Sequence, residues 1–365
     1  MKLRKYHLTL AISGLLGLSL LTTGCKNTVT PPPTSTWDQT TSDVLKDLTN
    51  NVIIPTFRDF DTRVGELQTA INTLKDQPNE QNLQAARDAW KRARHPWEAG
   101  EAYIFGPASS MGIDPAVDSW PLDENKLQST LDSNEVLDKT FFDNSEGTVK
   151  GAHAVEFLLW GNDGTKTASA LTPRELDYMV GCMLSFKGAT ETLLKAWVPA
   201  SEGGSDFGSK FYMAGKEGST YSTQVAAVGD ALRGMARLMD ELNNSKMGIP
   251  FTNQNLDFEE ARFSSNSKAD FIDNVLGVQS MYLGTYSTFS GKGFTVLVHA
   301  KDAALDSSVT AQLTDALTKI QSINPTFGDA VTNSRNSIQT ARFSVSEINR
   351  LVGTNVIEAL GIPKQ

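Results

Sequence analysis

The sequence predicts an all-α fold built from two helical bundles, and three observations support this class. Apolar residues recur at steps of three and four along much of the chain, which is the period of an amphipathic helix. Several of these segments follow residue patterns that cap helix N-termini. Alternating strand patterns joined by Asn-Gly or Asp-Gly turns are scarce, and Asp163-Gly164 lacks such flanking strands. We therefore expect about four helices in each bundle, joined by short connections.

Regular spacing of apolar side chains predicts three amphipathic helices. The residues with this spacing are Leu83, Ala86, Trp90, Ala93 and Trp97, then Val225, Val228, Leu232, Met235 and Met239, and then Val309, Leu313, Leu317 and Ile320. Another helix is predicted to begin after Thr172, because Pro173 follows it and Glu175 can reach back to the cap. The same type of cap at Ser267 and at Ser344 predicts two further helix starts.

A change in composition divides the predicted helical region. Residues 199–221 are rich in Gly and Ser and interrupt the helical period. We therefore predict an N-terminal bundle over residues 37–200 and a C-terminal bundle over residues 201–365. Segments ending at Gly106 and Gly284 share an aromatic residue shortly before the Gly, which suggests an old duplication. Helices commonly end at Gly, so the shared ending can also arise without a duplication.

Residues 1–24 have the composition of a lipoprotein signal peptide. Basic residues precede an apolar stretch, residues 8–21, which is too short to span a bilayer comfortably. The following Leu-Thr-Thr-Gly-Cys resembles a bacterial lipobox, so Cys25 is the expected lipidation site. Residues 25–36 contain three successive prolines and are expected to tether the folded part to a membrane. The alternative is a soluble secreted protein that is cut nearby.

Composition and charge restrict the class of protein. The 365 residues are 39% hydrophobic and 21% charged, as in ordinary globular proteins. The formal net charge is −9, and no basic stripe offsets it, so a nucleic-acid partner is not expected. If Cys25 carries lipid, Cys182 has no partner for an internal disulfide. Cys182 lies in an apolar helical run and is expected to be a buried small residue.

A His and a Glu three residues apart form the segment of greatest chemical interest. His153 and Glu156 occur in Gly-Ala-His-Ala-Val-Glu, and on a helix both side chains project from one face and could bind one cation. Ferritin-like bundles supply metal ligands with the mirror-order Glu-x-x-His pair. The HxxE spacing also occurs in hydrogen-bonded or solvated pairs, so a metal site needs additional ligands.

Acidic residues upstream of this motif could supply those ligands. Glu98 and Glu101 are predicted to share a helical face, and Asp114 and Asp118 lie in a predicted loop. Carboxylate oxygens with an imidazole suit iron, manganese or zinc better than Cu(I). For any one of these acids, including Glu98 and Asp114, a solvated surface charge is the simpler expectation.

Arg262 and two further histidines have other possible roles. Arg262 precedes a predicted helix start and could bind a ligand carboxylate or a protein acid. The alternative is an Arg that bridges the two domains. His95, directly before Pro96, is expected to cap or pack locally. His299 is expected to be a packed core histidine on an apolar helix.

Several motifs occur in order across both halves of the chain. They are the lipobox, Glu101-Ala102-Tyr103-Ile104-Phe105-Gly106-Pro107, Asp118-Ser119-Trp120-Pro121, Gly151-Ala152-His153-Ala154-Val155-Glu156, Arg262 to Asp270, and Tyr282-Leu283-Gly284. Together they resemble the imelysin-like family of bacterial lipoproteins. The resemblance implies two similar helical bundles with a functional site between them. The family was first described as metallopeptidases, and its relatives are linked to iron uptake and iron-regulated envelope proteins.

The resemblance also implies a set of site residues. The expected metal ligands are His153, Glu156, Glu101 and Asp118, and the expected ligand-binding residues near the cleft are Arg262, Ser264 and Asp270. We predict a lipid-anchored envelope protein, at the outer membrane, that binds iron or an iron-bearing ligand between its domains. It would pass this cargo to an outer-membrane receptor or transporter. Binding rather than catalysis is the expected activity.

Two alternatives belong to other functional classes. The first is a zinc metallopeptidase with Glu156 as its catalytic residue. No His-Glu-x-x-His or Gly-x-Ser-x-Gly motif occurs, so such a zinc site would consist mostly of carboxylates, which is unusual. The second is a surface module that binds a polysaccharide or a partner protein, which requires exposed Trp or Tyr side chains for stacking.

Overall fold

Residues 38–364, which the computed structural model describes, are mainly helical, and this confirms the predicted all-α class. The long helices are α1 (Gln39–Leu48), α2 (Ile54–Asp76), α3 (Glu80–Gly100), α8 (Gly151–Trp160), α9 (Pro173–Trp197), α11 (Gln224–Glu241), α13 (Ser267–Leu283), α15 (Ala303–Gln321) and α17 (Arg335–Arg350). Strands β1 (Thr285–Tyr286) and β2 (Phe289–Ser290) pair in an antiparallel hairpin. The predicted signal peptide, Cys25 and the tether lie outside the described residues.

Shorter helices connect these long ones. They are α4 (Pro107–Ser110), α5 (Ile113–Val117), α6 (Glu124–Asp132), α7 (Lys139–Asp143), α10 (Phe207–Tyr212), α12 (Gly248–Asn253), α14 (Phe294–Lys301), α16 (Phe327–Asn333) and α18 (Ile357–Ala359). Single 3₁₀ turns are η2 (Glu101–Tyr103), η3 (Gly147–Val149), η4 (Ala168–Ala170), η5 (Ala200–Glu202) and η7 (Leu256–Phe258). Three π-helical turns, η1 (Thr49–Ile53), η6 (Leu242–Lys246) and η8 (Leu351–Val356), extend longer helices. Such turns frequently occur at functional sites.

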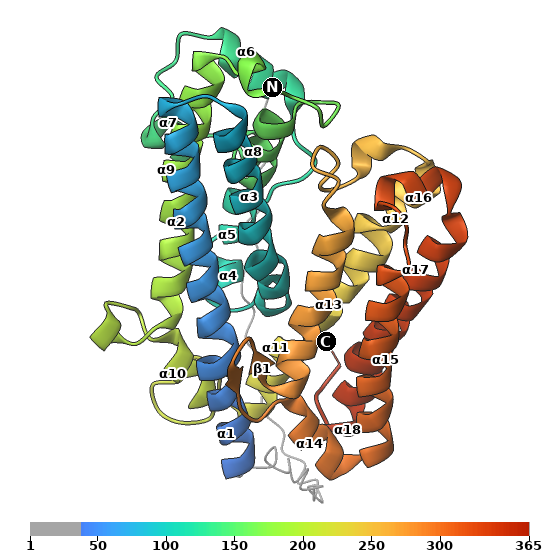
Figure 1. Cartoon of the computed structure of the whole chain (residues 1–365). Coiled ribbons are helices and arrows are strands. Elements are labelled where there is room, and N and C mark those ends of the chain that lie inside the picture. Colours follow the sequence, from blue (N-terminus) through green and yellow to red (C-terminus); the bar gives the residue numbers. More distant parts are fainter. Residues whose placement is uncertain (1–37, 365) are drawn as a thin grey trace, which may run out of the picture. The chain divides into compact units, whose positions relative to one another are not determined.

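The long helices pack in two groups that meet along one seam. Helices α2, α3, α8 and α9 contact one another, as do α11, α13, α15 and α17. The seam is formed chiefly by α3 and α13, which lie side by side (Figure 1). Their buried apolar residues form one continuous cluster, and residues 38–364 belong to one compact unit. The predicted boundary near residue 200 and the duplication stay predictions.

The Gly- and Ser-rich segment after residue 199 contains packed structure. Its helix α10 places Phe207 and Phe211 against Trp197, with ring centroids 5.0 and 6.1 Å from the Trp ring. Two aromatic residues at a spacing of four suffice to bury one face of this short helix. The segment therefore contributes to the core although its helical period is interrupted.

Most local predictions agree with the structure; the helix start predicted at Ser344 was wrong, and the one at Ser267 was right although Ser267 is not the capping residue. The three periodic segments form α3, α11 and α15, and Thr172 and Glu175 form a reciprocal capping box at α9. Ser267 is not a cap; it is the first residue of α13, and its hydroxyl binds Glu259 at 2.8 Å. Ser344 lies inside α17, where its hydroxyl binds Asp315 at 2.7 Å. Both hydroxyls are used by partners outside their own helix.

Burial of several predicted core residues is confirmed, with one error. Cys182, Met235 and Met239 are buried. His299 was predicted to be a packed core residue, but its side chain is 66% exposed and its Nδ1 lies 3.1 Å from Asp306 Oδ2. Within residues 38–364, no helix has both the length and the apolar character needed to cross a bilayer.

Two glycines allow the close backbone approaches that bring the polar residues together. Gly151 begins α8 with a φ of +75°, and a Cβ there would lie 2.3 Å from the carbonyl oxygen of Val117. Gly277 in α13 is so close to α3 that a Cβ would lie 2.0 Å from the carbonyl oxygen of Ala99. Gly151 thus places α8 beside the residue that follows Val117, and Gly277 keeps α13 against α3.

Candidate metal site

A buried polar cluster occupies the seam between α3 and α13. Its residues come from seven parts of the chain: Arg94 and Glu98 of α3, Glu101 of η2, Asp118 after α5, His153 and Glu156 of α8, Lys246 of η6, Glu260 of the loop before α13, and Asp270 and Asn274 of α13. Each of these residues is at most 8% exposed. Burial of this many charged groups is costly unless they pair with one another or with a bound ion.

His153 lies between two carboxylates. Its Nδ1 is 3.0 Å from Glu156 Oε2, one turn further along α8. Its Nε2 is 3.1 Å from Asp118 Oδ1, but the two atoms are not aligned as a hydrogen bond. The close contact between Gly151 and Val117 brings the ring to Asp118. The imidazole is therefore held at one nitrogen and presents the other to Asp118.

Both oxygens of Glu156 already have partners. Oε2 faces His153, and Oε1 accepts hydrogen bonds from the backbone N–H of Ser264 at 2.9 Å and from its hydroxyl at 2.7 Å. A carboxylate behind a histidine fixes the ring orientation and leaves the other nitrogen free to bind a metal. In this arrangement Glu156 supports His153 rather than providing a ligand atom of its own.

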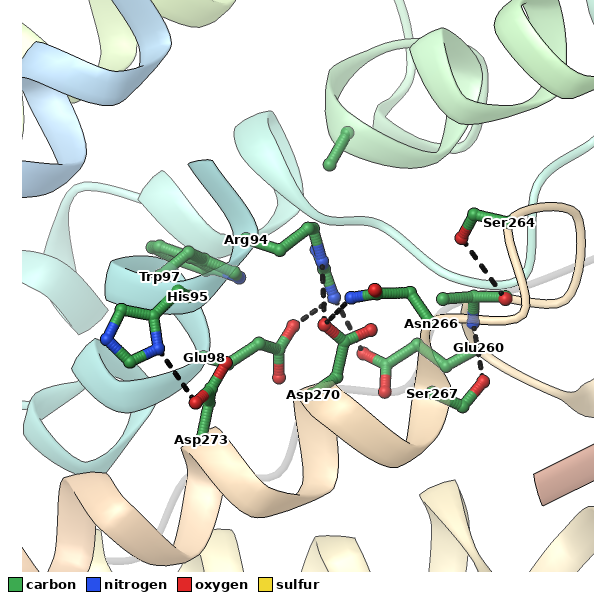
Figure 2. Close-up of polar contacts among 12 residues, drawn as sticks. Arg94, His95, Trp97, Glu98, Glu260, Ser264, Asn266, Ser267, Asp270 and Asp273 are labelled. Atoms are coloured by element: carbon green, nitrogen blue, oxygen red, sulfur yellow. Dashed lines mark hydrogen bonds and ion pairs between the residues drawn. The ribbon is translucent and has the colours of Figure 1, made fainter. Parts of the chain in front are cut away.

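Arg94 is the central cation of the cluster. Its Nη1 donates to Asp118 and its Nη2 to Glu98, while Asp270 and Glu260 each lie 3.5 Å from a guanidinium nitrogen. Figure 2 shows the guanidinium among the carboxylates of Glu98, Glu260 and Asp270. The indole of Trp97 donates to the second oxygen of Asp118. Arg94 thereby joins the two helix groups electrostatically.

Lys246 forms a second centre of positive charge. Its ammonium lies 2.7 Å from Glu101, 2.9 Å from Glu260 and 3.0 Å from Glu98. The side-chain amide of Asn274 donates to the same oxygen of Glu101 at 2.7 Å. The π-helical turn η6 carries Lys246. Glu101 is thus bound by Lys246 and Asn274, away from His153.

The cluster contains more acids than cations. Its carboxyl groups are those of Glu98, Glu101, Asp118, Glu156, Glu260 and Asp270, and its basic groups are those of Arg94, Lys246 and His153. Burial and repulsion from Glu98 raise the pKa of Glu101 well above its usual value, and burial does the same to Asp270. Burial also raises the pKa of Glu260 to about 7. The metal-free protein therefore relieves its excess negative charge by retaining protons.

Asp118 and His153 form an ion pair in the metal-free protein. Burial opposes both charges, but the attraction to Arg94 and His153 more than offsets it and lowers the pKa of Asp118 well below its ordinary value. Asp118 in turn outweighs the burial of His153 and raises the pKa of that ring to about 10. A metal cation that bound Nε2 would displace the proton and take over the role of counter-charge to Asp118.

Asp118, His153 and Glu260 are the residues best placed to bind a metal. Each offers one ligand atom, and the three atoms lie within 4.8 Å of one another. His153 Nε2 and Glu260 Oε2 are buried without a hydrogen-bond partner among the described residues. An imidazole nitrogen and two carboxylate oxygens at this separation fit a hard or borderline cation. The donor set therefore suits iron, manganese or zinc.

The imelysin (peptidase M75) sequence pattern matches residues 53–352. The chain belongs to the imelysin family. It is 30% identical over 247 residues to iron-regulated protein A of Synechococcus elongatus, and this match covers 68% of the chain and 65% of that relative. The chain therefore spans somewhat less than two thirds of this relative's length.

Two solved structures share the fold. One is of an iron-regulated protein A precursor from Parabacteroides distasonis, with a TM-score of 0.81 and 21% identity, over 89% of this chain and 96% of that one. The other is of an imelysin-like protein from Psychrobacter arcticum, with a TM-score of 0.69 and 16% identity, over 90% and 98% of the two chains. At these identities the comparison concerns the fold alone.

The imelysin-family motifs converge only in part. Asp118, His153 and Glu156 lie together, with Ser264 bound to Glu156. Asp270 Oδ1 lies 3.5 Å from Arg94 Nε and accepts a hydrogen bond from the side-chain amide of Asn266 at 2.8 Å.

Arg262 lines the small cavity beside this cluster, but its ion pairs are with acids outside the cluster. It pairs with Glu124, lies 3.8 Å from Asp257, and stacks over Phe263 at 4.2 Å from the ring centroid. Its guanidinium is already engaged by protein acids.

Arg94, Lys246 and Glu260 are not among the site residues predicted from the sequence. Arg94 carries a detectable signal, because it lies four residues after Trp90 on the apolar stripe of α3, where a charge must have a buried partner. Glu260 and Lys246 have no such local signal. The prediction of Glu98 as a solvated charge was wrong, since Arg94 and Lys246 hold it in the core. His95 is half exposed and binds Asp273 at 2.7 Å.

Proposed function

We propose that this imelysin-family chain binds iron in the bacterial cell envelope and delivers it for uptake. The observation that most directly supports this proposal is the buried triad of Asp118, His153 and Glu260, whose ligand atoms lie within 4.8 Å of one another. Two carboxylates and an imidazole are a donor set suited to iron. The relative in Synechococcus elongatus is named iron-regulated protein A, which supports iron as the cargo.

The electrostatics of the cluster support binding of a cation. The buried carboxyl groups outnumber the basic groups, and Glu260 and Asp270 retain an unpartnered oxygen. A cation bound to the triad would reduce this excess of negative charge and satisfy His153 Nε2 and Glu260 Oε2 at once. In this proposal Glu156 orients His153, and Arg94 and Lys246 compensate the remaining acids.

A metallopeptidase is the less favoured function. The cavity that adjoins the triad has a volume of about 20 Å³, enough for about one water molecule, so a peptide bond does not fit beside it. Glu156, the expected catalytic residue, has both oxygens bound to Ser264 and His153. A general base needs a free oxygen within reach of the attacking water.

A surface module that stacks sugars or peptides on aromatic rings is also less favoured. Every Trp and Tyr from residue 38 to residue 364 is buried or half-buried. The large apolar side chains exposed in this range belong to Phe, Leu, Ile, Val and Met residues that are scattered along the chain.

Metal analysis of purified protein tests the proposal. Wild-type protein should bind about one iron per chain, and His153→Ala should lose it. His95→Ala is the matched control, because His95 is also paired with an acid but lies half exposed outside the triad. Equal iron content in the three proteins would reject a site centred on His153. Loss of iron in both variants would also reject it, because the effect would not be specific.

The envelope location is part of the same proposal. Lipidation at Cys25 predicts that radiolabelled palmitate enters wild-type protein in the native host and not Cys25→Ser. An outer-membrane location predicts co-fractionation of the wild type with that membrane. Delivery to an outer-membrane receptor or transporter predicts that deletion of the chain slows iron accumulation. Labelling of Cys25→Ser at the wild-type level would reject the anchor.

A further inference from the structure

A small cavity lies directly beside the proposed iron ligands. It has a volume of about 20 Å³ and is lined by residues that include Trp120, His153, Glu260, Arg262 and Phe263. This volume is enough for one water-sized group and too small for a larger organic ligand. The cavity therefore limits what can approach the triad from this side.

Three residues around this cavity have buried polar atoms without a hydrogen-bond partner. Among the described residues, these atoms are Trp120 Nε1, Glu260 Oε2 and His153 Nε2, the last of which lies 3.1 Å from Asp118 Oδ1 in an ion pair that is not aligned as a hydrogen bond. His153 is 1% exposed and Glu260 is 4% exposed, so solvent does not satisfy them. Buried polar groups almost always have partners, and each exception requires an explanation. One common ligand would explain all three.

The chemistry of the three atoms defines that ligand. The indole N–H of Trp120 is a donor only, so its partner must be an acceptor. His153 Nε2 and Glu260 Oε2 would bind the cation, and three protein ligands leave its coordination incomplete. The guanidinium of Arg262 is engaged by Glu124 and does not compete for the position. An oxygen atom bound to the cation would fill the cavity and accept from Trp120.

We propose that the cavity holds a single solvent-derived oxygen ligand of the bound cation, a water or hydroxide, and that Trp120 positions it by donating a hydrogen bond. This inference rests on the proposed iron site and adds its exogenous ligand. Trp120 acts through that oxygen and does not itself touch the metal. The site would therefore bind a cation that keeps one water or hydroxide ligand in preference to a cation that requires only soft protein ligands.

Cobalt(II) is the probe, because its visible absorption reports both binding and the ionisation of a bound water. Trp120→Phe removes the N–H and keeps an aromatic ring. Trp197→Phe is the matched control, since Trp197 Nε1 is also buried without a partner but lies in the aromatic cluster near Phe207. Trp120→Phe should weaken Co(II) binding by about tenfold and raise the pH at which the band changes, whereas Trp197→Phe should change neither.

Equal affinity and an equal pH midpoint in the two variants would overturn the role of Trp120 while leaving the metal site intact. Wild-type protein that binds neither iron nor Co(II) would reject the proposed function and this inference with it. If Trp120→Phe does not fold, benzothienylalanine at position 120 replaces the N–H by sulfur with little change of shape. The same weakening and the same pH shift are expected for that variant, and wild-type behaviour would overturn the proposal.

Discussion

His153 Nδ1 lies 3.0 Å from Glu156 Oε2, so the two polar residues of the HxxE motif are partners of each other. The separation of one helical turn places the carboxylate behind the imidazole and directs Nε2 toward Asp118. The remaining oxygen of Glu156 is bound by Ser264 from the other half of the chain. In the proposed iron site, the motif would therefore supply one metal ligand and the group that orients it, and not a pair of ligands.

Glu156→Gln should weaken cation binding by about 10- to 100-fold, because an amide can direct an N–H at His153 Nδ1 and favour the wrong tautomer. The Co(II) absorption spectrum of the loaded variant should keep the wild-type shape, since no ligand atom is lost. Glu175→Gln, which alters the capping box of α9, serves as the control. A changed spectrum would instead indicate that Glu156 binds the metal directly.

Arg94→Met should lower the free energy of unfolding of the metal-free protein by about 3–5 kcal/mol, because it leaves Asp118 and Glu98 buried without their counter-charge. Urea unfolding measures the change, and added cation should restore part of the stability. In the control, Arg87→Met, the lost partners are the backbone carbonyls of Leu159 and Lys166. That variant should lose about 1–3 kcal/mol without recovery by metal. Equal behaviour of the two variants would contradict a central role for Arg94.

Glu101→Gln and Asp118→Asn should differ in their effect on metal binding. Glu101 is bound by Lys246 and Asn274 at 2.7 Å, so its substitution should change the dissociation constant by less than about threefold. Asp118 contributes an oxygen to the triad, so Asp118→Asn should weaken binding by at least about tenfold. Isothermal titration calorimetry with Co(II) compares them. The reverse order would identify Glu101 as the ligand.

The metal-free protein should lose stability as the pH rises from about 5 to about 9. The pKa of Glu260 is raised from 4.5 to about 7, so between these values the folded state holds a proton that the unfolded state has lost. The pKa of His153 is raised from 6.5 to about 10. Its contribution to the stability of the fold is therefore complete below pH 6.5 and disappears as the pH approaches 10. For each proton that the folded state binds and the unfolded state does not, the free energy of unfolding falls by about 1.4 kcal/mol per pH unit.

Asp118 sets the acid limit of this window. Because the pKa of Asp118 is lowered in the folded state, its ionised carboxylate stabilises the fold at pH values above 3.8, the ordinary pKa of Asp. This stability is lost as the pH falls below 3.8. Urea unfolding of chelator-treated protein at several pH values gives the profile, and Glu260→Gln should flatten it between pH 5 and 7. Stability that rises steadily from pH 5 to pH 9 would rule out this assignment of protons.

Cys182 should resist alkylation in the native protein at pH 8. Its side chain is fully buried, and burial raises the pKa of the thiol to about 12, so neither access nor the reactive thiolate is available. Iodoacetamide labelling of the peptide that contains Cys182, followed by mass spectrometry, should show modification only after unfolding in urea. Rapid labelling of the folded protein would show that this part of α9 opens locally.

Local features of the sequence predict the helices well, because helix formation depends on neighbours within one or two turns. The apolar stripe of α3 and the capping box at Thr172 are examples. The same local logic fails at Ser344, where a cap-like pattern lies inside a continuous amphipathic helix. A cap is only one of several competing interactions, and burial of Ile338, Val345 and Ile348 on one helical face outweighs it.

The sequence by itself therefore determined the helical class, most helix positions and the segment that carries His153. The resemblance placed Asp118 with this histidine, but only the tertiary structure decided that Glu260 joins them, that Arg94 and Lys246 balance the acids, and that His299 faces solvent. The physical reason is that the cost of a buried charge depends on partners that are distant in sequence. Glu260 and Asp118 are 142 positions apart by their numbers, and only packing of α13 against α3 brings them together.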